Sequence, residues 1–355
     1  MAPKQKRSQQ DDLTSVKKPK TRSINYSLCI PTSIINRSNA KNLQQVTNIL
    51  YQIAKVASIY NVGEIIIMDI QTPPDEKVNL NDVQDPNSKK KIKFDDDNTS
   101  TEKAKNEVSE DAMTIATILQ YFVTPPYLTK TLFKKKFFSN FQYAKNFPKL
   151  TTLPFMNPEV SSKYREGLTV TMGKTTKSQN KSKKSQPLKN TKFVNIGYDK
   201  YLELQGQQVP VNVRVTVNTE TKKVVSPIEA YEEQVGAKSS YGYHVRIAKK
   251  FTSIFTESSY PDGYSQSIYI NSGDYFIKPN KKPELAEVKL NDSQDLNLLL
   301  IISKWNDIEL AFKYDSKNLS GVENPKEFFD GQITIPEGTR IEDGSLIALT
   351  KLSTL

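Results

Sequence analysis

The heptapeptide EIIIMDI, residues 64–70, decides the fold class of this 355-residue chain. Four apolar residues follow one another without alternation, which is typical of a strand buried on both faces of a sheet. Upstream, SINYSLCIP (residues 23–31) is predicted to be a short strand. Between the two, residues 39–61 carry apolar positions at helical spacing. Strand, helix and buried strand form a β-α-β unit, so we predict an α/β fold with a parallel sheet.

The pattern of predicted secondary structure changes twice along the rest of the chain. SEDAMTIATILQYF (residues 109–122) is predicted to be a helix capped by Ser109 and ended by Pro125-Pro126. Between about residues 165 and 226 only short strands separated by polar turns occur, which indicates a small β barrel of OB-like size. Strand patterns then return in YGYHVRIA, YSQSIYI, LNLLLIIS and GQITIP, followed by a helix in DGSLIALTKL.

These changes divide the chain into four parts. We expect a disordered basic tail at residues 1–23 and the first part of the α/β domain at 24–164, with a charged insertion at 71–108. A β-barrel insertion at 165–240, with a lysine-rich loop at 173–192, interrupts that domain. Residues 241–355 complete it.

Composition excludes several classes of protein. Hydrophobic residues make up 36% of the chain and the mean hydropathy is −0.57, which favours some tail or linker. No apolar run approaches the roughly 18 to 20 residues that cross a bilayer. The N-terminus, MAPKQKRSQQDD, lacks the apolar region of a secretory signal. We therefore expect a soluble intracellular protein with no membrane partner.

The chain has one cysteine, Cys29, and one histidine, His244. An intrachain disulfide is excluded, and a Cys/His zinc site has almost nothing to assemble from, so no metal is expected. His244 lies in YGYHVRIA, where alternation makes it a packed or surface strand residue rather than a general base. Hydrolytic triads are excluded because neither residue has a supporting motif.

The formal charge of +11 favours a polyanion as partner. The tail contains KRSQQDDLTSVKKPK, which has the spacing of a two-part nuclear-import signal; this stays a hypothesis. The insertion at residues 71–108 sets KKKIK beside FDDDN, so it is expected to be a solvated surface segment.

The loop GKTTKSQNKSKKSQPLKNTK (residues 173–192) contains no acidic residue, so we predict that it contacts phosphates; a merely solubilising loop is the alternative. Exposed lysines elsewhere would add further contacts to phosphates. Tyr198 and Tyr201 could stack on unpaired bases, the alternative being ordinary barrel packing. The predicted RNA-binding residues are Lys174, Lys177, Lys181, Lys183, Lys184, Lys189, Lys192, Lys134, Lys135 and Lys136.

Four stretches, in this order of elements, carry a resemblance to a known family. They are LQYFVTPPYL (residues 119–128), YREG (164–167), YGYHVRIAKKF (241–251) and YPDGY (260–264). Over about residues 24–352 the chain resembles the SPOUT-class RNA methyltransferases with an inserted OB-like domain. The resemblance implies a trefoil-knotted α/β fold, S-adenosylmethionine bound in the knot, an RNA substrate and a dimer. Fungal relatives are associated with assembly of the large ribosomal subunit, which implies pre-ribosomal RNA and proteins as partners in the nucleus and nucleolus.

Three loops hold the cofactor in family members, and each departs from the family pattern here. In SIYINSGD (residues 267–274), Tyr269 falls where a glycine is expected, and would either point away or occupy space. In LLLIISKWNDIE (298–309), Ser303-Lys304-Trp305 replace a glycine pair and bring bulk and positive charge towards a ligand with a sulfonium cation. IPEGTRIEDGSLIAL (335–349) keeps Pro-Gly-Thr-Arg but lacks a second arginine.

We therefore predict an RNA-binding assembly factor in ribosome biogenesis with a lost or weak methyltransferase site and no bound cofactor. The first alternative is an active S-adenosylmethionine-dependent rRNA methyltransferase, in which Arg340 would orient the substrate. The second is a scaffold that binds only proteins. The sequence leaves open a homodimer or a heterodimer with a related chain. The vestigial cofactor residues are Asn271, Ser272, Gly273, Ser303, Pro336, Gly338 and Thr339.

Overall fold

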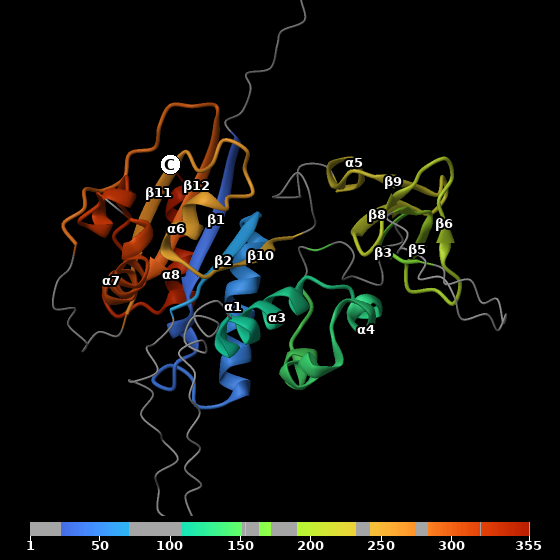
Figure 1. The fold of residues 1–355 in the computed structure, drawn as a ribbon, viewed down its shortest axis with the longest axis horizontal. Helices are drawn as coiled ribbons and strands as arrows, with labels where there is room; N and C mark the ends of the chain where they lie inside the picture. The colour runs from blue at the N-terminus through green and yellow to red at the C-terminus, as the bar shows by residue number, and fades with distance from the viewer. Residues whose placement is uncertain are drawn as a thin grey trace, which may run out of the picture.

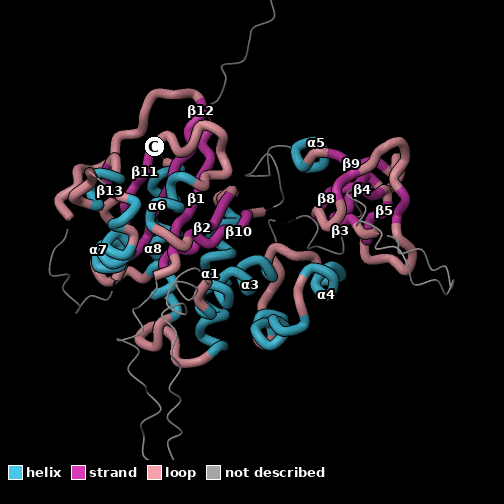
Figure 2. The backbone as a smooth tube through the Cα atoms, viewed as in Figure 1, coloured by secondary structure: helices cyan, strands magenta, loops and turns pink. Residues whose placement is uncertain are grey.

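The computed structural model describes residues 23–70, 108–150, 153, 163–171, 190–231, 242–273, 283–319 and 321–354. The predicted basic tail except Ser23, the charged insertion except Val108, and the lysine-rich loop except residues 190–192 lie outside these residues. An α/β part and a smaller antiparallel part lie next to each other (Figure 1). The described strands of each part group separately (Figure 2).

The α/β part is built on a parallel sheet with the strand order β10-β2-β1-β12-β11-β13. β1 and β2 pair in parallel, with Leu28 opposite Ile65, and helix α1 connects them, so the predicted β-α-β unit is confirmed. The strand bounds are β1 (Ser23–Pro31), β2 (Glu64–Met68), β10 (His244–Ala248), β11 (Gln266–Asn271), β12 (Asp295–Ser303) and β13 (Gly331–Gln332).

Helices cover both faces of this sheet, which explains the apolar run that does not alternate. Ile65 and Ile67 pack with one set of helices (α1, α3, α8), whereas Ile66 and Met68 pack with the other (α6, α7). Ser109 accepts the backbone N–H of Ala112 and caps α3, as predicted. The helices are α1 (Leu43–Ile59), α3 (Glu110–Phe122), α4 (Thr129–Leu132), α5 (Pro227–Tyr231), α6 (Phe251–Thr256), α7 (Trp305–Tyr314) and α8 (Ile341–Ser353), with 3₁₀ turns at Thr32–Ile35, Pro126–Leu128, Lys135–Phe141, Ala144–Asn146, Ser316–Asn318 and Pro325–Phe328.

The antiparallel part has a five-stranded sheet in the order β6-β5-β3-β8-β9 and a two-stranded sheet of β4 and β7. Its small core contains Val194, Ile196, Leu204 and Val217. An antiparallel sheet of short strands is therefore confirmed, while its OB-like class and its role as an inserted domain stay predictions. The strands are β3 (Tyr164–Thr169), β4 (Asn190–Thr191), β5 (Phe193–Asn195), β6 (Leu202–Glu203), β7 (Val209–Pro210), β8 (Arg214–Asn218) and β9 (Lys223–Val225).

One predicted strand is much shorter than expected. Of GQITIP, only Gly331–Gln332 belongs to β13. Ile333 still donates its N–H to the Tyr269 carbonyl of β11, but the N–H and hydroxyl of Thr334 bond to the Glu287 carboxylate rather than to a strand. Apolar alternation alone did not reveal this competing side-chain partner.

The described residues bear on the expectations about membrane spans, metal sites, the single cysteine and the single histidine. No described helix is long and apolar enough to cross a membrane. The described residues hold no group of three or more His, Cys, Asp or Glu side chains that could bind a metal ion. Burial raises the pKa of the Cys29 thiol to about 12, so this thiol is protonated and a poor nucleophile near neutral pH. His244 is an exposed residue of β10, one of the two placements predicted for it.

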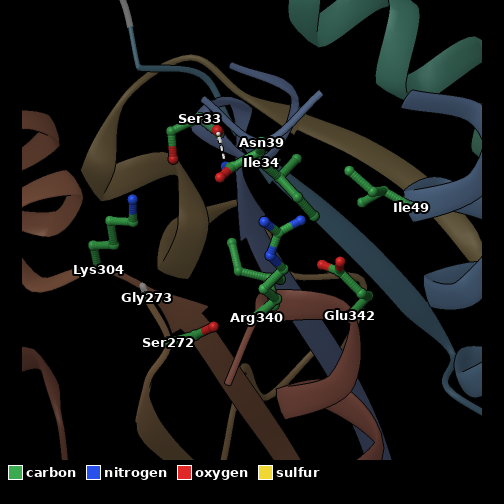
Figure 3. A pocket seen from close by; sticks show the side chains of 10 residues that line it. Ser33, Ile34, Asn39, Ile49, Ser272, Gly273, Lys304, Arg340 and Glu342 are labelled. Atoms are coloured by element: carbon green, nitrogen blue, oxygen red, sulfur yellow. Dashed lines mark hydrogen bonds between the residues drawn. The ribbon is translucent and has the colours of Figure 1, made fainter. Parts of the chain in front are cut away.

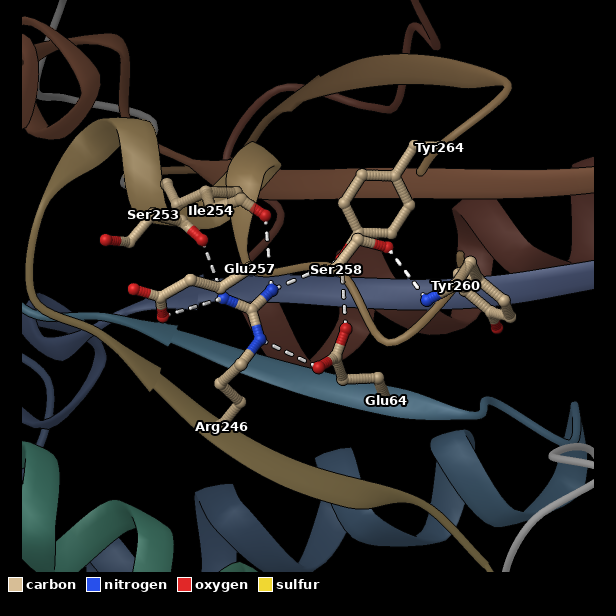
Figure 4. A network of polar contacts seen from close by, with 8 residues as sticks. All are labelled: Glu64, Arg246, Ser253, Ile254, Glu257, Ser258, Tyr260 and Tyr264. Carbon is tan, nitrogen blue, oxygen red and sulfur yellow. Dashed lines mark hydrogen bonds and ion pairs between the residues drawn. The ribbon is translucent and has the colours of Figure 1, made fainter. Parts of the chain in front are cut away.

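A buried carboxylate, Glu64, ties three segments of the α/β part together (Figure 4). Its Oε1 lies 2.8 Å from Nε of Arg246 on β10, and its Oε2 accepts the Tyr264 hydroxyl at 2.9 Å. Arg246 also donates to the backbone carbonyls of Ser253 and Ile254. The carboxylate and the guanidinium therefore compensate each other and hold β2, β10, α6 and the turn before β11.

We expect Glu64→Gln to destabilise the fold, because the substitution leaves the mostly buried Arg246 without its closest counter-charge. The loss should fall near the lower end of the ~3–5 kcal/mol typical of breaking a buried ion pair from one side. Urea unfolding followed by circular dichroism measures it.

Glu203→Gln is the matched control, because it removes the carboxylate of the exposed Lys192–Glu203 pair. This change should cost less than about 1 kcal/mol. Equal midpoints for the two variants would contradict a central role for Glu64.

Candidate functional site

A pocket open to solvent lies beyond the carboxyl ends of β1, β12 and β11 (Figure 3). These strands are adjacent and parallel, and β1 separates β2 from β12. In open parallel sheets this edge is where ligands bind. The pocket is lined by Ser33, Ile34, Asn39, Ile49, Ser272, Gly273, Lys304, Arg340, Ile341 and Glu342.

Backbone and hydroxyl hydrogen bonds join the three loops that the sequence singled out. The backbone N–H of Ser272 donates to the Ser303 carbonyl at 3.1 Å. The Thr339 carbonyl accepts the Ser272 hydroxyl at 2.8 Å and the Gly273 N–H at 3.2 Å. The loops after β11, after β12 and before α8 therefore form one assembled wall.

The predicted site residues divide between this wall and its support. Ser272, Gly273 and Arg340 line the pocket. Ser303 is fully buried behind it, and Asn271 accepts the Tyr269 hydroxyl. Pro336, Gly338 and Thr339 form a turn, in which the Thr339 N–H donates to the Pro336 carbonyl and Gly338 takes a φ of 81°. That positive φ favours glycine at this position.

Tyr269 points away from the pocket, which decides between the two placements that the sequence allowed. It is fully buried, and its ring packs edge-on against Trp305 at 5.2 Å and Phe329 at 5.5 Å. All three belong to the core cluster on the α7 side of the sheet. The prediction that Trp305 brings bulk towards the ligand is therefore wrong, because its indole is part of that core.

Lys304 is the residue of the altered second loop that does reach the pocket. A Cβ placed on Gly273 would lie 3.3 Å from Lys304 Cγ and 3.5 Å from Lys304 Cε. The aliphatic part of the Lys304 side chain thus lies against Gly273, close to where a Cβ at residue 273 would point. Figure 3 shows the ammonium group above this position, on the wall opposite Arg340.

The pocket carries two cations and a carboxylate whose charge is disfavoured by burial. Arg340 extends from the start of α8 towards Ile34 and Glu342 (Figure 3). Burial raises the pKa of the Glu342 carboxyl, and the nearby Arg340 opposes this shift. Burial likewise raises the pKa of Asp307, against the hydrogen bond that Ser33 donates to it and the charge of Lys304.

The wall formed by residues 33–49 and Glu342 was missed by the sequence reasoning. The signal was present, since PTSIINRSN (residues 31–39) is a polar segment directly after a buried parallel strand. Such segments meet at the ligand edge of a sheet. The interpretation instead followed the three loops that the family resemblance named.

Four of the ten predicted RNA-binding lysines fall within the described residues. Lys134, Lys135 and Lys136 are exposed as expected. Lys192, by contrast, forms an ion pair with Glu203. The last residue of the lysine-rich loop is therefore paired within the protein, which the absence of acidic residues from the loop itself did not indicate. The remaining lysines lie outside the described residues: Lys174, Lys177, Lys181, Lys183, Lys184 and Lys189.

Two tyrosines of the antiparallel part are exposed rather than packed. Tyr198 is 59% exposed and Tyr201 is 48% exposed. Both lie in the connection between β5 and β6. Ordinary barrel packing does not describe either ring.

The chain matches the family model described as "Putative RNA methyltransferase" over residues 25–352. It is 38% identical to "Putative methyltransferase YMR310C" of Saccharomyces cerevisiae, across 96% of this chain and 97% of that protein. It is 34% identical to "Putative methyltransferase YGR283C" of the same yeast, across 92% and 87%. The 28S rRNA (uridine-N(3))-methyltransferase of Drosophila melanogaster is 26% identical, across 92% of this chain and 61% of that protein. Since the family model covers most of the sequence, the chain belongs to the RNA methyltransferase family that this model describes.

Proposed function

We propose that this chain is an RNA-binding assembly factor of ribosome biogenesis whose methyltransferase pocket has lost most or all of its affinity for S-adenosylmethionine. It would keep the trefoil-knotted SPOUT fold with an OB-like insertion and act on large-subunit precursor RNA. Membership of the RNA methyltransferase family and the net charge of +11 support RNA as the partner. Partners would include pre-ribosomal proteins and a second SPOUT chain, identical or related, in the nucleus and nucleolus.

The observation that carries this proposal is the position of Lys304 beside Gly273. The lysine stem covers the backbone that a ligand would approach, and its ammonium adds a cation to a pocket that already holds Arg340. S-adenosylmethionine itself carries a sulfonium cation. Two like charges about 4 Å apart repel by roughly 1 to 4 kcal/mol between bulk water and a protein surface. The residues present therefore fit this cofactor poorly, and we assign no catalytic step to Arg340.

RNA binding needs none of these pocket residues. In the proposed mode the lysine-rich loop, the basic tail and the exposed Lys134, Lys135 and Lys136 contact phosphates and position the RNA. Each contact releases counterions, so affinity falls steeply as salt rises. A scaffold that binds only proteins would lack this dependence.

An active methyltransferase is the second candidate, because the pocket lies at the ligand edge of the sheet and Tyr269 and Trp305 leave it open. The Drosophila relative named as a 28S rRNA methyltransferase also favours it. In that case Asn271, Ser272 and Gly273 would lie against the cofactor and Arg340 would orient the RNA. Transfer of a labelled methyl group from S-adenosylmethionine to ribosomal RNA by the purified protein would establish this activity.

Isothermal titration with S-adenosylmethionine tests the role of Lys304. We expect the wild-type protein to bind too weakly to measure at micromolar concentrations. Lys304→Ala should strengthen binding at least tenfold, because it removes both the stem and the charge. Lys313→Ala, an exposed lysine at the other end of α7, is the matched control and should change nothing. Micromolar binding by the wild type, unchanged in Lys304→Ala, would overturn the proposal.

Replacing the six lysines at 174, 177, 181, 183, 184 and 189 with glutamine tests whether the lysine-rich loop contacts RNA phosphates. The slope of log affinity against log salt for a single-stranded RNA should flatten by about 0.7 for every lysine that contacts a phosphate. Fluorescence anisotropy at several salt concentrations measures the slope. Lys192→Gln is the control with a small expected effect, since Glu203 already pairs with Lys192. An unchanged slope in the variant with all six substitutions would show that the loop does not contact the RNA.

A further inference from the structure

One face of the exposed Tyr198 ring packs against Arg165, whose guanidinium is itself held by a hydrogen bond to the backbone. The Arg165 guanidinium lies over the Tyr198 ring, 4.4 Å from its centroid, and its Nη1 donates to the Tyr198 hydroxyl at 3.3 Å. Arg165 Nε donates to the Ile196 carbonyl at 2.6 Å, two residues before the tyrosine. One face of the ring is therefore covered and held, and its 59% exposure belongs to the rest of the ring.

A second tyrosine, Tyr127, supports the arginine from the α/β part. Arg165 lies over the Tyr127 ring at 4.5 Å, and the Tyr127 hydroxyl donates to the Glu166 carbonyl at 3.0 Å. Gly197 permits this approach, because a Cβ there would lie 2.4 Å from Tyr127 Cδ2 and its φ is 81°. The loop that presents Tyr198 is thus fixed against a neighbouring element before any ligand arrives.

We propose that the outer face of Tyr198 is a stacking platform for an unpaired base of single-stranded RNA. An aromatic ring offers a base a π-face without reading its edges, and such stacking is the usual way in which proteins hold unpaired bases. Because Arg165 already holds the ring, binding costs little side-chain entropy. Tyr201, three residues on and 48% exposed, is placed to contact a neighbouring nucleotide.

The part of the sequence that contains the platform is basic, which suits a nucleic acid rather than an apolar partner. Residues 163–231 contain thirteen lysines and arginines against five acidic residues, so this part of the sequence carries eight of the eleven net positive charges. Asp199 and Lys200 lie between the two exposed tyrosines, and six of the thirteen cations, all lysines, lie outside the described residues. Paired bases are stacked within a duplex and offer no free face, so single strands are the ligand class that the tyrosine selects. This inference rests on the proposed function, which supplies RNA as the partner.

The test compares full-length variants for binding to a fluorescein-labelled single-stranded oligouridine and to a duplex RNA of the same length. Tyr198→Ala should weaken binding to the single strand by about 10-fold to 100-fold, the range of one lost stacking contact. Tyr198→Phe should keep affinity within about threefold, since the ring remains. Tyr314→Ala, on α7 and 46% exposed, is the matched control and should bind as the wild type does.

A fluorescence signal reports stacking directly. The chain has one tryptophan, the buried Trp305, so Tyr198→Trp adds a single exposed indole. The single strand should quench its emission, whereas a Tyr314→Trp variant should show no such change. If the wild type binds the single strand but Tyr198→Ala binds equally well, the platform is refuted and the proposed function stands. If the wild type binds no RNA at all, the proposed function fails with it.

Discussion

The buried carboxylate of Glu64 constrains how the segments of the α/β part can come together. It lies at the start of β2 and needs a partner, because an unpaired charge at this depth costs several kcal/mol. The partner, Arg246, comes from the far side of the inserted antiparallel unit. The returning strand must therefore enter the sheet in the register that places His244 opposite Glu64. Tyr264 then fixes the turn that leads into β11 and so into the pocket wall.

The sheet was predictable because burial on both faces leaves a pattern in the sequence. EIIIM and LNLLLIIS have few polar residues, and both are strands of the parallel sheet. The face of the strand on which a side chain lies is harder to predict from the sequence. The apolar pattern placed Tyr269 in the predicted strand YSQSIYI, and β11 confirms this, but the family resemblance left open whether the ring points away from the pocket or occupies it. The structure decides this through packing, since the Tyr269 ring lies against Trp305 and Phe329 in the core on the α7 side.

The remaining errors concern contacts between segments far apart in the sequence. Lys304 was recognised as a charge, but the course of its stem along Gly273 depends on how two loops meet. Glu203 neutralises Lys192 because β5 and β6 pair, and the spacing of charges in the lysine-rich loop gave no sign of it. Arg165 belonged to a stretch that carried the family resemblance, yet its position over two tyrosine rings was not foreseeable. Such pairings are set by tertiary structure.

In the proposed function, cofactor binding and RNA binding use separate residues, and this separation makes the loss of one compatible with the other. The pocket is a wall of three loops at one edge of the parallel sheet, where one lysine changes both shape and charge. Residues 163–231 carry eight of the eleven net positive charges, and the exposed Tyr198 and Tyr201 belong to the same part of the sequence. Phosphate contacts act on any strand, whereas a fixed ring distinguishes unpaired from paired bases. A protein with both can choose a structural state of RNA without modifying it.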